Sequence, residues 1–255
     1  MVAMIATSLR PLGTKACVQQ LTGSLRSLGA PKTTVWTKAS VPARMAFSTP
    51  LGTSTSQTVK STDRLTERSK GNPVMEALLS RRTIGDFTDE KVPDQIVTSA
   101  LEAARWAPNH KLTEPWKFYW LGANTIEAIA KLNSDTIEAA GQPTKAAAKY
   151  EKWRNIKGWI AVTSALSPEN SLVEQEDYAA TCCSIQNIML ALHSQGVGSK
   201  WTTGAVTRTK EMADLIGYSL EEERPVGIIF YGMPAKAEAV SLRRKNFTDV
   251  VQFVP

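Results

Sequence analysis

The sequence predicts an α+β fold in which helices cover a central sheet. Beyond residue 70, apolar residues recur mainly at three- and four-residue steps, which is the spacing of amphipathic helices. Three short runs rich in aromatic or β-branched residues, at 116–122, 158–166 and 226–231, are the strand candidates and are spread along the chain. A doubly wound α/β sheet is the alternative, although no strand is followed by GxGxxG and no GxxxxGK[ST] occurs.

Capping residues mark the expected ends of the helices. Asn72-Pro73 predicts an N-cap followed by proline in the first helical position, so the first helix should run from there to Ser80-Arg81-Arg82. Gly196 and Gly217 are expected just beyond the ends of two later helices, where a left-handed residue is favourable. The other helices are predicted at 93–107, 124–140, 177–195 and 209–216, with a short strand or loop at 199–205.

The net charge of +6 is concentrated at the start of the chain. Residues 1–62 contain seven Lys and Arg but no Asp or Glu, and the first acidic residue is Asp63. Subtracting those seven charges from +6 leaves −1 for residues 63–255, where no basic stripe is interleaved with aromatic residues. We therefore expect no nucleic-acid partner.

The composition of the N-terminal segment is typical of an organellar transit peptide. It is rich in Arg, Lys, Ser and Thr, and it lacks the compact apolar region of a secretory signal. Residues 44–49 resemble a mitochondrial processing site, which favours the mitochondrion over the plastid. Residues 1–70 are thus predicted to be transit peptide and linker, and residues 71–255 the folded domain. A tail without a targeting role is the alternative.

The sequence offers little for metal, disulfide or membrane chemistry. Cys182 and Cys183 are adjacent in an apolar helical pattern and are predicted to be small buried residues. The two histidines, His110 and His193, have no partner at a metal-ligand spacing, so we expect no metal. No apolar run approaches the ~18 residues that a membrane-spanning helix needs.

The first candidate binding segment is Ser80-Arg81-Arg82-Thr83, at the end of the first predicted helix. Two guanidinium groups beside a hydroxyl can hold a dianionic phosphate through charge-assisted hydrogen bonds. The alternative is a solvated basic pair that complements the helix dipole.

Two further segments could contact a ligand. A short polar loop between Ala107-Pro108 and Pro115-Trp116 carries His110 and Lys111, although it could equally be an ordinary helix-to-strand connection. The segment 195–204 combines glycines, which allow close backbone approach, with Trp201 and two threonines that offer stacking and hydrogen bonds.

Together and in this order, the segments resemble the nitroreductase-like FMN family. Arg81-Arg82-Thr83 resembles that family's R-R-S motif, and the 107–118 segment resembles its A-P-S-x-x-N-x-Q-P-W-R-F element. Residues 177–204 resemble the family's central helix and G-x-G-S-x-W turn, and Arg243-Arg244-Lys245 resembles its C-terminal basic signature. The resemblance covers about residues 72–255 and is closest to the minimal single-domain NAD(P)H nitroreductases.

The resemblance implies a central, mainly antiparallel sheet flanked by helices. It implies a homodimer with FMN at the interface, across which the C-terminal tail packs. The FMN contacts that it implies are Arg81, Arg82, Thr83, His110, Lys111, Trp201, Thr202, Thr203 and Arg244. The segment for the nicotinamide cofactor corresponds to Ala191, Leu192, His193, Ser194, Gln195 and Gly196. No side chain is assigned a covalent catalytic role.

Two positions depart from the family pattern. Leu112 replaces the usual Asn of the loop, and Glu114 replaces the usual Gln before Pro-Trp. Contacts to the flavin ring would then fall to His110 and Lys111. Because a carboxylate beside an anionic flavin is unfavourable, Glu114 is expected to point away or to pair with Lys111 or Lys117.

The activity implied by the resemblance is that of an FMN-dependent NAD(P)H oxidoreductase. Such an enzyme reduces small electron-poor acceptors, such as nitroaromatics and quinones, by hydride transfer in a ping-pong cycle. One alternative is a flavin dehydrogenase or reductive dehalogenase on the same fold. The other is a non-catalytic flavin-binding protein that acts as a sensor or cofactor store.

Overall fold

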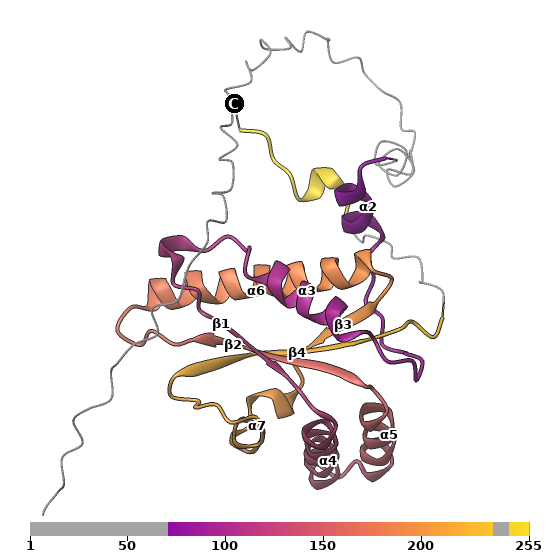
Figure 1. Cartoon of the computed structure of the whole chain (residues 1–255). Coiled ribbons are helices and arrows are strands. Elements are labelled where there is room, and N and C mark those ends of the chain that lie inside the picture. The colour runs from indigo at the N-terminus through magenta and orange to yellow at the C-terminus, as the bar shows by residue number, and fades with distance from the viewer. Residues whose placement is uncertain (1–70, 237–244, 255) are drawn as a thin grey trace, which may run out of the picture. The chain divides into compact units, whose positions relative to one another are not determined.

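The computed structural model describes residues 71–236 and 245–254 (Figure 1). One four-stranded sheet has the order β1-β2-β4-β3, and every neighbouring pair of strands is antiparallel. The antiparallel pairing confirms the α+β prediction and excludes the doubly wound alternative, whose strands are parallel. The strands are β1 (Trp116–Trp120), β2 (Gly158–Ala165), β3 (Gly198–Thr202) and β4 (Glu223–Gly232).

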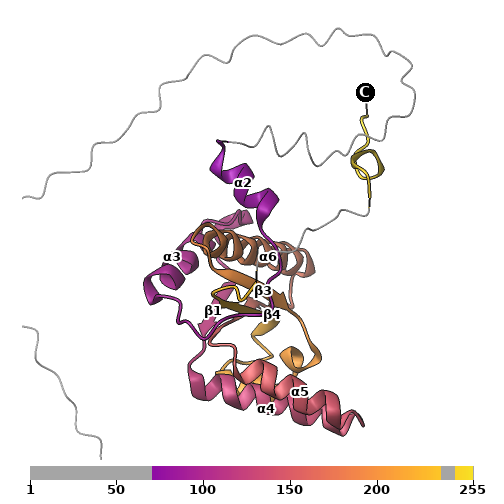
Figure 2. The same cartoon turned by 90° about the vertical axis from the view of Figure 1, so that its right-hand side faces the viewer.

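Helices cover both faces of this sheet (Figures 1 and 2). On one face lie α3 (Asp94–Ala104) and α6 (Ser171–Ser194). On the other lie α4 (Ala123–Ala139), α5 (Pro143–Arg154) and α7 (Lys210–Ile216). The short helix α2 (Pro73–Ser80) contains no buried residue.

Alternation of side chains along the strands produces two separate apolar cores. Ile160 and Val162 of β2 belong to the core beneath α3 and α6. Trp159 and Ala161 face the other way, into the core beneath α4, α5 and α7. The fully buried Trp159 ring lies 4.5 Å from Phe230 and 5.4 Å from Trp153, centroid to centroid. Each face of the sheet is therefore sealed by its own set of helices.

A buried carboxylate ties three strands together. Glu223 at the start of β4 is 4% exposed and accepts hydrogen bonds from Lys117 and Tyr119 of β1 and from Thr163 of β2, at 2.5, 2.8 and 2.5 Å. Burial by itself would raise the pKa of Glu223, but hydrogen bonds from Lys117, Thr163 and Tyr119 outweigh it and lower the pKa. The carboxylate therefore stays ionised inside the fold.

The predicted helix boundaries agree with the structure where a capping residue marks them. The Asn72 side chain accepts hydrogen bonds from the first-turn amides of Val74 and Met75. Gly196 and Gly217 are left-handed, with φ of 76° and 91°, just beyond α6 and α7. These three predictions are confirmed.

Helix α5 was not predicted, and other elements are longer than expected. Only Ala146 and Trp153 of α5 are buried, so its apolar stripe is too narrow to give a clear helical period. Helix α6 begins at Ser171 instead of 177, and β4 begins at Glu223 instead of 226. Neither extra segment has enough apolar residues to show a period: Leu172 and Val173 are adjacent at the start of α6, and Glu223-Arg224-Pro225 has only the proline.

The prediction that both adjacent cysteines are buried is wrong. Cys182 is half-buried, whereas Cys183 is exposed, because α6 turns the next residues, Ser184 and Ile185, toward the sheet. No helix in the described part of the chain is long and apolar enough to cross a membrane. Within those same residues, no cluster of three or more His, Cys, Asp or Glu could hold a metal ion. The predicted transit peptide and linker, residues 1–70, lie outside the described residues.

Candidate functional site

Two of the predicted binding segments lie side by side at one edge of the sheet. After α2 ends, Thr83 forms a parallel bridge with Ser199 of β3. The amide of Ile84 donates to the Ser199 carbonyl at 3.0 Å. The Arg81-Arg82-Thr83 segment is therefore aligned next to the start of β3, although the two segments are more than a hundred residues apart in the chain.

This junction has the groups that a phosphate needs. Arg82 is half-buried, and its Nη1 donates to the carbonyls of Leu79 and Arg81 at 2.7 and 2.9 Å, which fixes the guanidinium. The Ser199 hydroxyl is buried without a hydrogen-bond partner among the described residues. A guanidinium fixed in this way suits a ligand that accepts charge-assisted hydrogen bonds.

Lys200 is a basic residue next to this junction that sequence reasoning did not assign. It faces the side of the sheet covered by α4, α5 and α7, because its register partner is Phe230, whereas Ser199 pairs with Tyr231 on the other side. It follows Ser199 on β3, and its Cδ would lie 3.6 Å from a Cβ placed on Gly85. Burial and the ammonium groups of Lys200, Lys152 and Lys145 together lower the pKa of Lys149 on α5. The Asp86 carboxylate lies among these ammonium groups and pairs with Lys152 at 2.7 Å, so it offsets part of the positive charge. Lys200 lies near residues 83–85 because Thr83 bridges to Ser199, and a contact between such distant parts of the chain has no local sequence signal.

Trp201 packs against β4. Its indole Nε1 donates to the Val226 carbonyl at 3.3 Å. A Cβ on Gly227, whose φ is 149°, would lie 2.5 Å from that nitrogen, so the close approach requires glycine. The ring therefore fixes the end of β3, from which the half-buried Thr202 and the exposed Thr203 continue.

The loop 109–114 holds His110 and Lys111 in an unusual backbone conformation. Lys111, Leu112 and Glu114 all have left-handed φ, at 60°, 54° and 46°. Left-handed conformations in residues other than glycine are uncommon, and each such residue costs about 1–3 kcal/mol unless its surroundings impose it. Strain of this kind is concentrated at functional sites.

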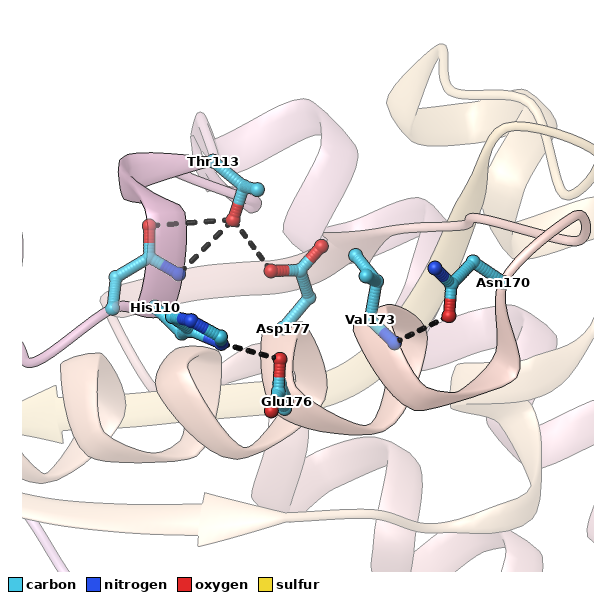
Figure 3. Close-up of polar contacts among 7 residues, drawn as sticks. His110, Thr113, Asn170, Val173, Glu176 and Asp177 are labelled. Atoms are coloured by element: carbon cyan, nitrogen blue, oxygen red, sulfur yellow. Dashed lines mark hydrogen bonds and ion pairs between the residues drawn. The ribbon is translucent and has the colours of Figure 1, made fainter.

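Side chains of α6 hold this loop. His110 Nδ1 lies 2.8 Å from a carboxylate oxygen of Glu176, and the Thr113 hydroxyl donates to Asp177 at 2.5 Å. Figure 3 shows His110 next to Glu176 and Thr113 next to Asp177. Inside the loop, the Asn109 side-chain oxygen accepts from the Glu114 amide at 2.7 Å. Lys117, a suggested partner of Glu114, pairs with Glu223 instead.

The segment predicted for the nicotinamide cofactor lies at the C-terminal end of α6, beside α2. The Ser80 hydroxyl donates to the Glu76 carbonyl at 2.6 Å, so it accepts from His193 Nε2 at 2.7 Å. Leu192 is fully buried in the core, which leaves only its backbone for a ligand. Ser194, Gln195 and Gly196 are exposed, whereas Ala191 is half-buried. The remaining predicted FMN contact, Arg244, lies outside the described residues.

The two halves of the predicted flavin site do not meet within one chain. His193, next to the phosphate junction, and Glu176, next to the loop, are both on α6. They are seventeen residues apart, which is about 25 Å at the helical rise of 1.5 Å per residue. The loop and the phosphate junction are therefore held near opposite ends of α6.

Comparison with known proteins agrees with this arrangement of elements. The model of the Nitroreductase family matches residues 78–233. A Bacillus subtilis (strain 168) protein, provisionally named NAD(P)H nitroreductase YfhC, is 32% identical over 178 residues, which cover 67% of this chain and 91% of that protein.

Solved structures show the same fold. The nitroreductase-like family protein from Bacillus cereus has a TM-score of 0.62 and 29% identity, covering 71% of this chain and 95% of that one. A provisionally assigned nitroreductase from Desulfovibrio desulfuricans, solved with FMN, has a TM-score of 0.57 and 24% identity, covering 72% and 98%. The family match runs from the end of α2 to the end of β4 and includes every motif quoted above except the C-terminal basic one. The chain therefore belongs to the nitroreductase family.

Proposed function

We propose that the protein is an FMN-dependent oxidoreductase that takes electrons from NAD(P)H and passes them to small electron-poor acceptors such as nitroaromatics and quinones. The observation that carries this proposal is the junction between Arg81-Arg82-Thr83 and β3, which places two guanidiniums and the exposed Thr83 at one edge of the sheet. The FMN bound to the Desulfovibrio desulfuricans neighbour and the name of the Bacillus subtilis relative support the same reading.

The active form in this proposal is a homodimer. The loop 109–114 and the phosphate junction of one chain are about 25 Å apart along α6, so one chain cannot bring both to the same FMN. A second copy that places its loop against the junction of the first completes the site, and two-fold symmetry then produces two equal sites. The exposed apolar residues of α2, which include Val74 and Leu78, are suited to such an interface.

Each group of residues then has a defined task. FMN, when bound, supplies the two-electron chemistry that links a nicotinamide donor to an organic acceptor. Arg81, Arg82 and Thr83 hold the phosphate. His110 of the other copy offers its Nε2 as a hydrogen-bond acceptor to the ring system, and Lys111 offers a positive charge. The exposed end of α6 at 194–196 borders the space into which NAD(P)H would enter.

Initial rates with both substrates varied test this function. NADPH and NADH serve as donors, and a quinone and a nitroaromatic as acceptors. Donor and acceptor would use one site in turn, so double-reciprocal plots should be parallel, as in a ping-pong cycle. Protein that contains FMN but turns over neither donor would contradict the enzymatic proposal and support a non-catalytic flavin-binding protein.

A further inference from the structure

The loop 109–114 has a backbone shape that its residue types do not favour. Lys111, Leu112 and Glu114 are left-handed, and none of them is a glycine or an asparagine, which tolerate that region best. The loop is also exposed, so core packing does not impose the conformation. Hydrogen bonds of the Asn109 side chain with Thr113 and with the Glu114 amide support it from within, and contacts from α6 connect it to the rest of the fold.

We propose that Glu176 and Asp177, consecutive residues of α6, are positioning residues that hold this loop in the shape in which His110 and Lys111 complete the flavin site. The inference rests on the proposed function and extends it to residues that touch neither flavin nor substrate. It is carried by the two contacts to one turn of α6, at His110 and at Thr113 (Figure 3).

Asp177 is the buried member of this pair of carboxylates. It is 3% exposed and lies in the buried stripe of α6 with Ala180 and Thr181. A buried carboxylate is unfavourable unless it is hydrogen-bonded, so an apolar residue would serve the packing of α6 better. Its carboxylate accepts from the Thr113 hydroxyl, which in turn accepts from the Asn109 side-chain amide at 3.0 Å. Through Thr113, Asp177 thereby fixes the Asn109 side chain, whose oxygen accepts from the Glu114 amide.

Glu176 sets the orientation of the imidazole. Its carboxylate engages His110 Nδ1, so that nitrogen carries the proton and Nε2 is the ring atom left for a ligand. Helix α6 has 24 residues and packs on the sheet, so it is a rigid element. Hydrogen bonds to its two carboxylates therefore fix the position of the loop. Sites supported in this way keep the geometry that the reaction needs.

The test compares Thr113→Val with Thr113→Ser in the full chain. Valine keeps the shape but removes the hydroxyl, whereas serine restores it. For Thr113→Val we expect hydrogen exchange at the loop amides to become about tenfold faster and kcat with a quinone to fall about tenfold. FMN affinity, measured by flavin fluorescence, should change by less than about threefold, because the phosphate junction is untouched. Thr113→Ser should restore both properties.

Two further variants separate positioning from a structural role. Glu176→Ala should lower kcat like Thr113→Val, whereas Glu174→Ala, which removes a carboxylate two residues away that pairs with Arg224, should change nothing. Faster exchange with unchanged kcat in Thr113→Val would overturn the proposal, as would an equal loss in Glu174→Ala. A wild-type chain that takes up no FMN would instead overturn the proposed function and remove the positioning role with it.

Discussion

Arg82 carries the phosphate assignment most directly, because its guanidinium is already fixed by two backbone carbonyls. Arg82→Ala should weaken FMN binding by about 10- to 100-fold, the range expected for losing hydrogen bonds to a charged group. Equilibrium dialysis of FMN against the variant measures this. The control is Arg105→Ala, which removes an exposed arginine paired with Glu102. Full flavin occupancy in purified Arg82→Ala would show that the phosphate is held elsewhere.

Gly158 controls how β2 begins. A Cβ there would lie 2.4 Å from the Tyr231 ring, whose hydroxyl accepts from the Trp120 indole at 2.7 Å. Gly158→Ala should therefore lower the free energy of unfolding by about 1–3 kcal/mol through overpacking. Urea unfolding measures it, and Gly204→Ala, whose Cβ would meet nothing within 4 Å, is the matched control. Equal stability of the two variants would contradict the packing described here.

Residue-level chemistry explains why the binding motifs could be recognised from sequence while their roles could not. Arg81-Arg82-Thr83 and Trp201-Thr202-Thr203 are contiguous runs, so the sequence predicts them as units. Their adjacency depends on the Thr83–Ser199 bridge, which no local pattern encodes. Lys200 was missed for that reason. Glu176 and Asp177 were missed because two acids on a helix normally indicate a solvated face.

At the scale of elements, Glu223 is the link between β1, β2 and β4. Its folded-state pKa is lowered from the ordinary 4.5, so its stabilising contribution is present above that pH and is lost as pH falls through the lower folded value. Glu223→Gln should lower the free energy of unfolding by about 2 kcal/mol at neutral pH, and by less at about pH 3.

Urea unfolding at both pH values tests this linkage. The matched control is Glu151→Gln, whose carboxylate is exposed and 3.7 Å from Arg154, and it should change stability by less than about 0.5 kcal/mol. If Glu223→Gln lowers the free energy of unfolding equally at both pH values, the charge of the carboxylate does not contribute to stability.

Elements with strong local signals were predicted, and those held by tertiary contacts were not. Helix α7 has Gly217 to end it, and β2 contains the apolar run Trp159–Val162. Helix α5 has four basic residues and a narrow buried stripe, and its stability comes from packing against α4. The start of α6, residues 171–176, also lacks a clear apolar period and was likewise not predicted to be helical. The parts that sequence analysis missed are thus those that depend on a neighbouring element.

For the whole molecule, the exposed apolar face of α2 predicts a dimer. Val74 and Leu78 are 66% and 44% exposed and one helical turn apart. Leu78→Glu should weaken the dimer more than about 100-fold, because it removes about 1.5–3 kcal/mol of burial from each of two copies. Sedimentation velocity measures this, with Leu215→Glu on α7 as the control. A wild-type monomer that binds FMN would contradict the two-chain site.

The N-terminal segment predicts where the whole protein is delivered. We propose that residues 1–70 are a mitochondrial transit peptide, because residues 1–62 are basic, rich in hydroxyl side chains and free of acids. Fused to a fluorescent protein, residues 1–70 should direct it to mitochondria, and changing the seven Lys and Arg of residues 1–62 to Gln should abolish import. Delivery to plastids, or no targeting, would contradict the proposal.

The most direct test of the central claim is an absorption spectrum of the full chain, purified without added cofactor and recorded anaerobically before and after NADPH, then NADH. We expect the two visible bands of an oxidised flavin, which is identified as FMN after release. The bands should bleach with at least one donor and return when a quinone is added. A colourless protein that also fails to take up added FMN would contradict the account.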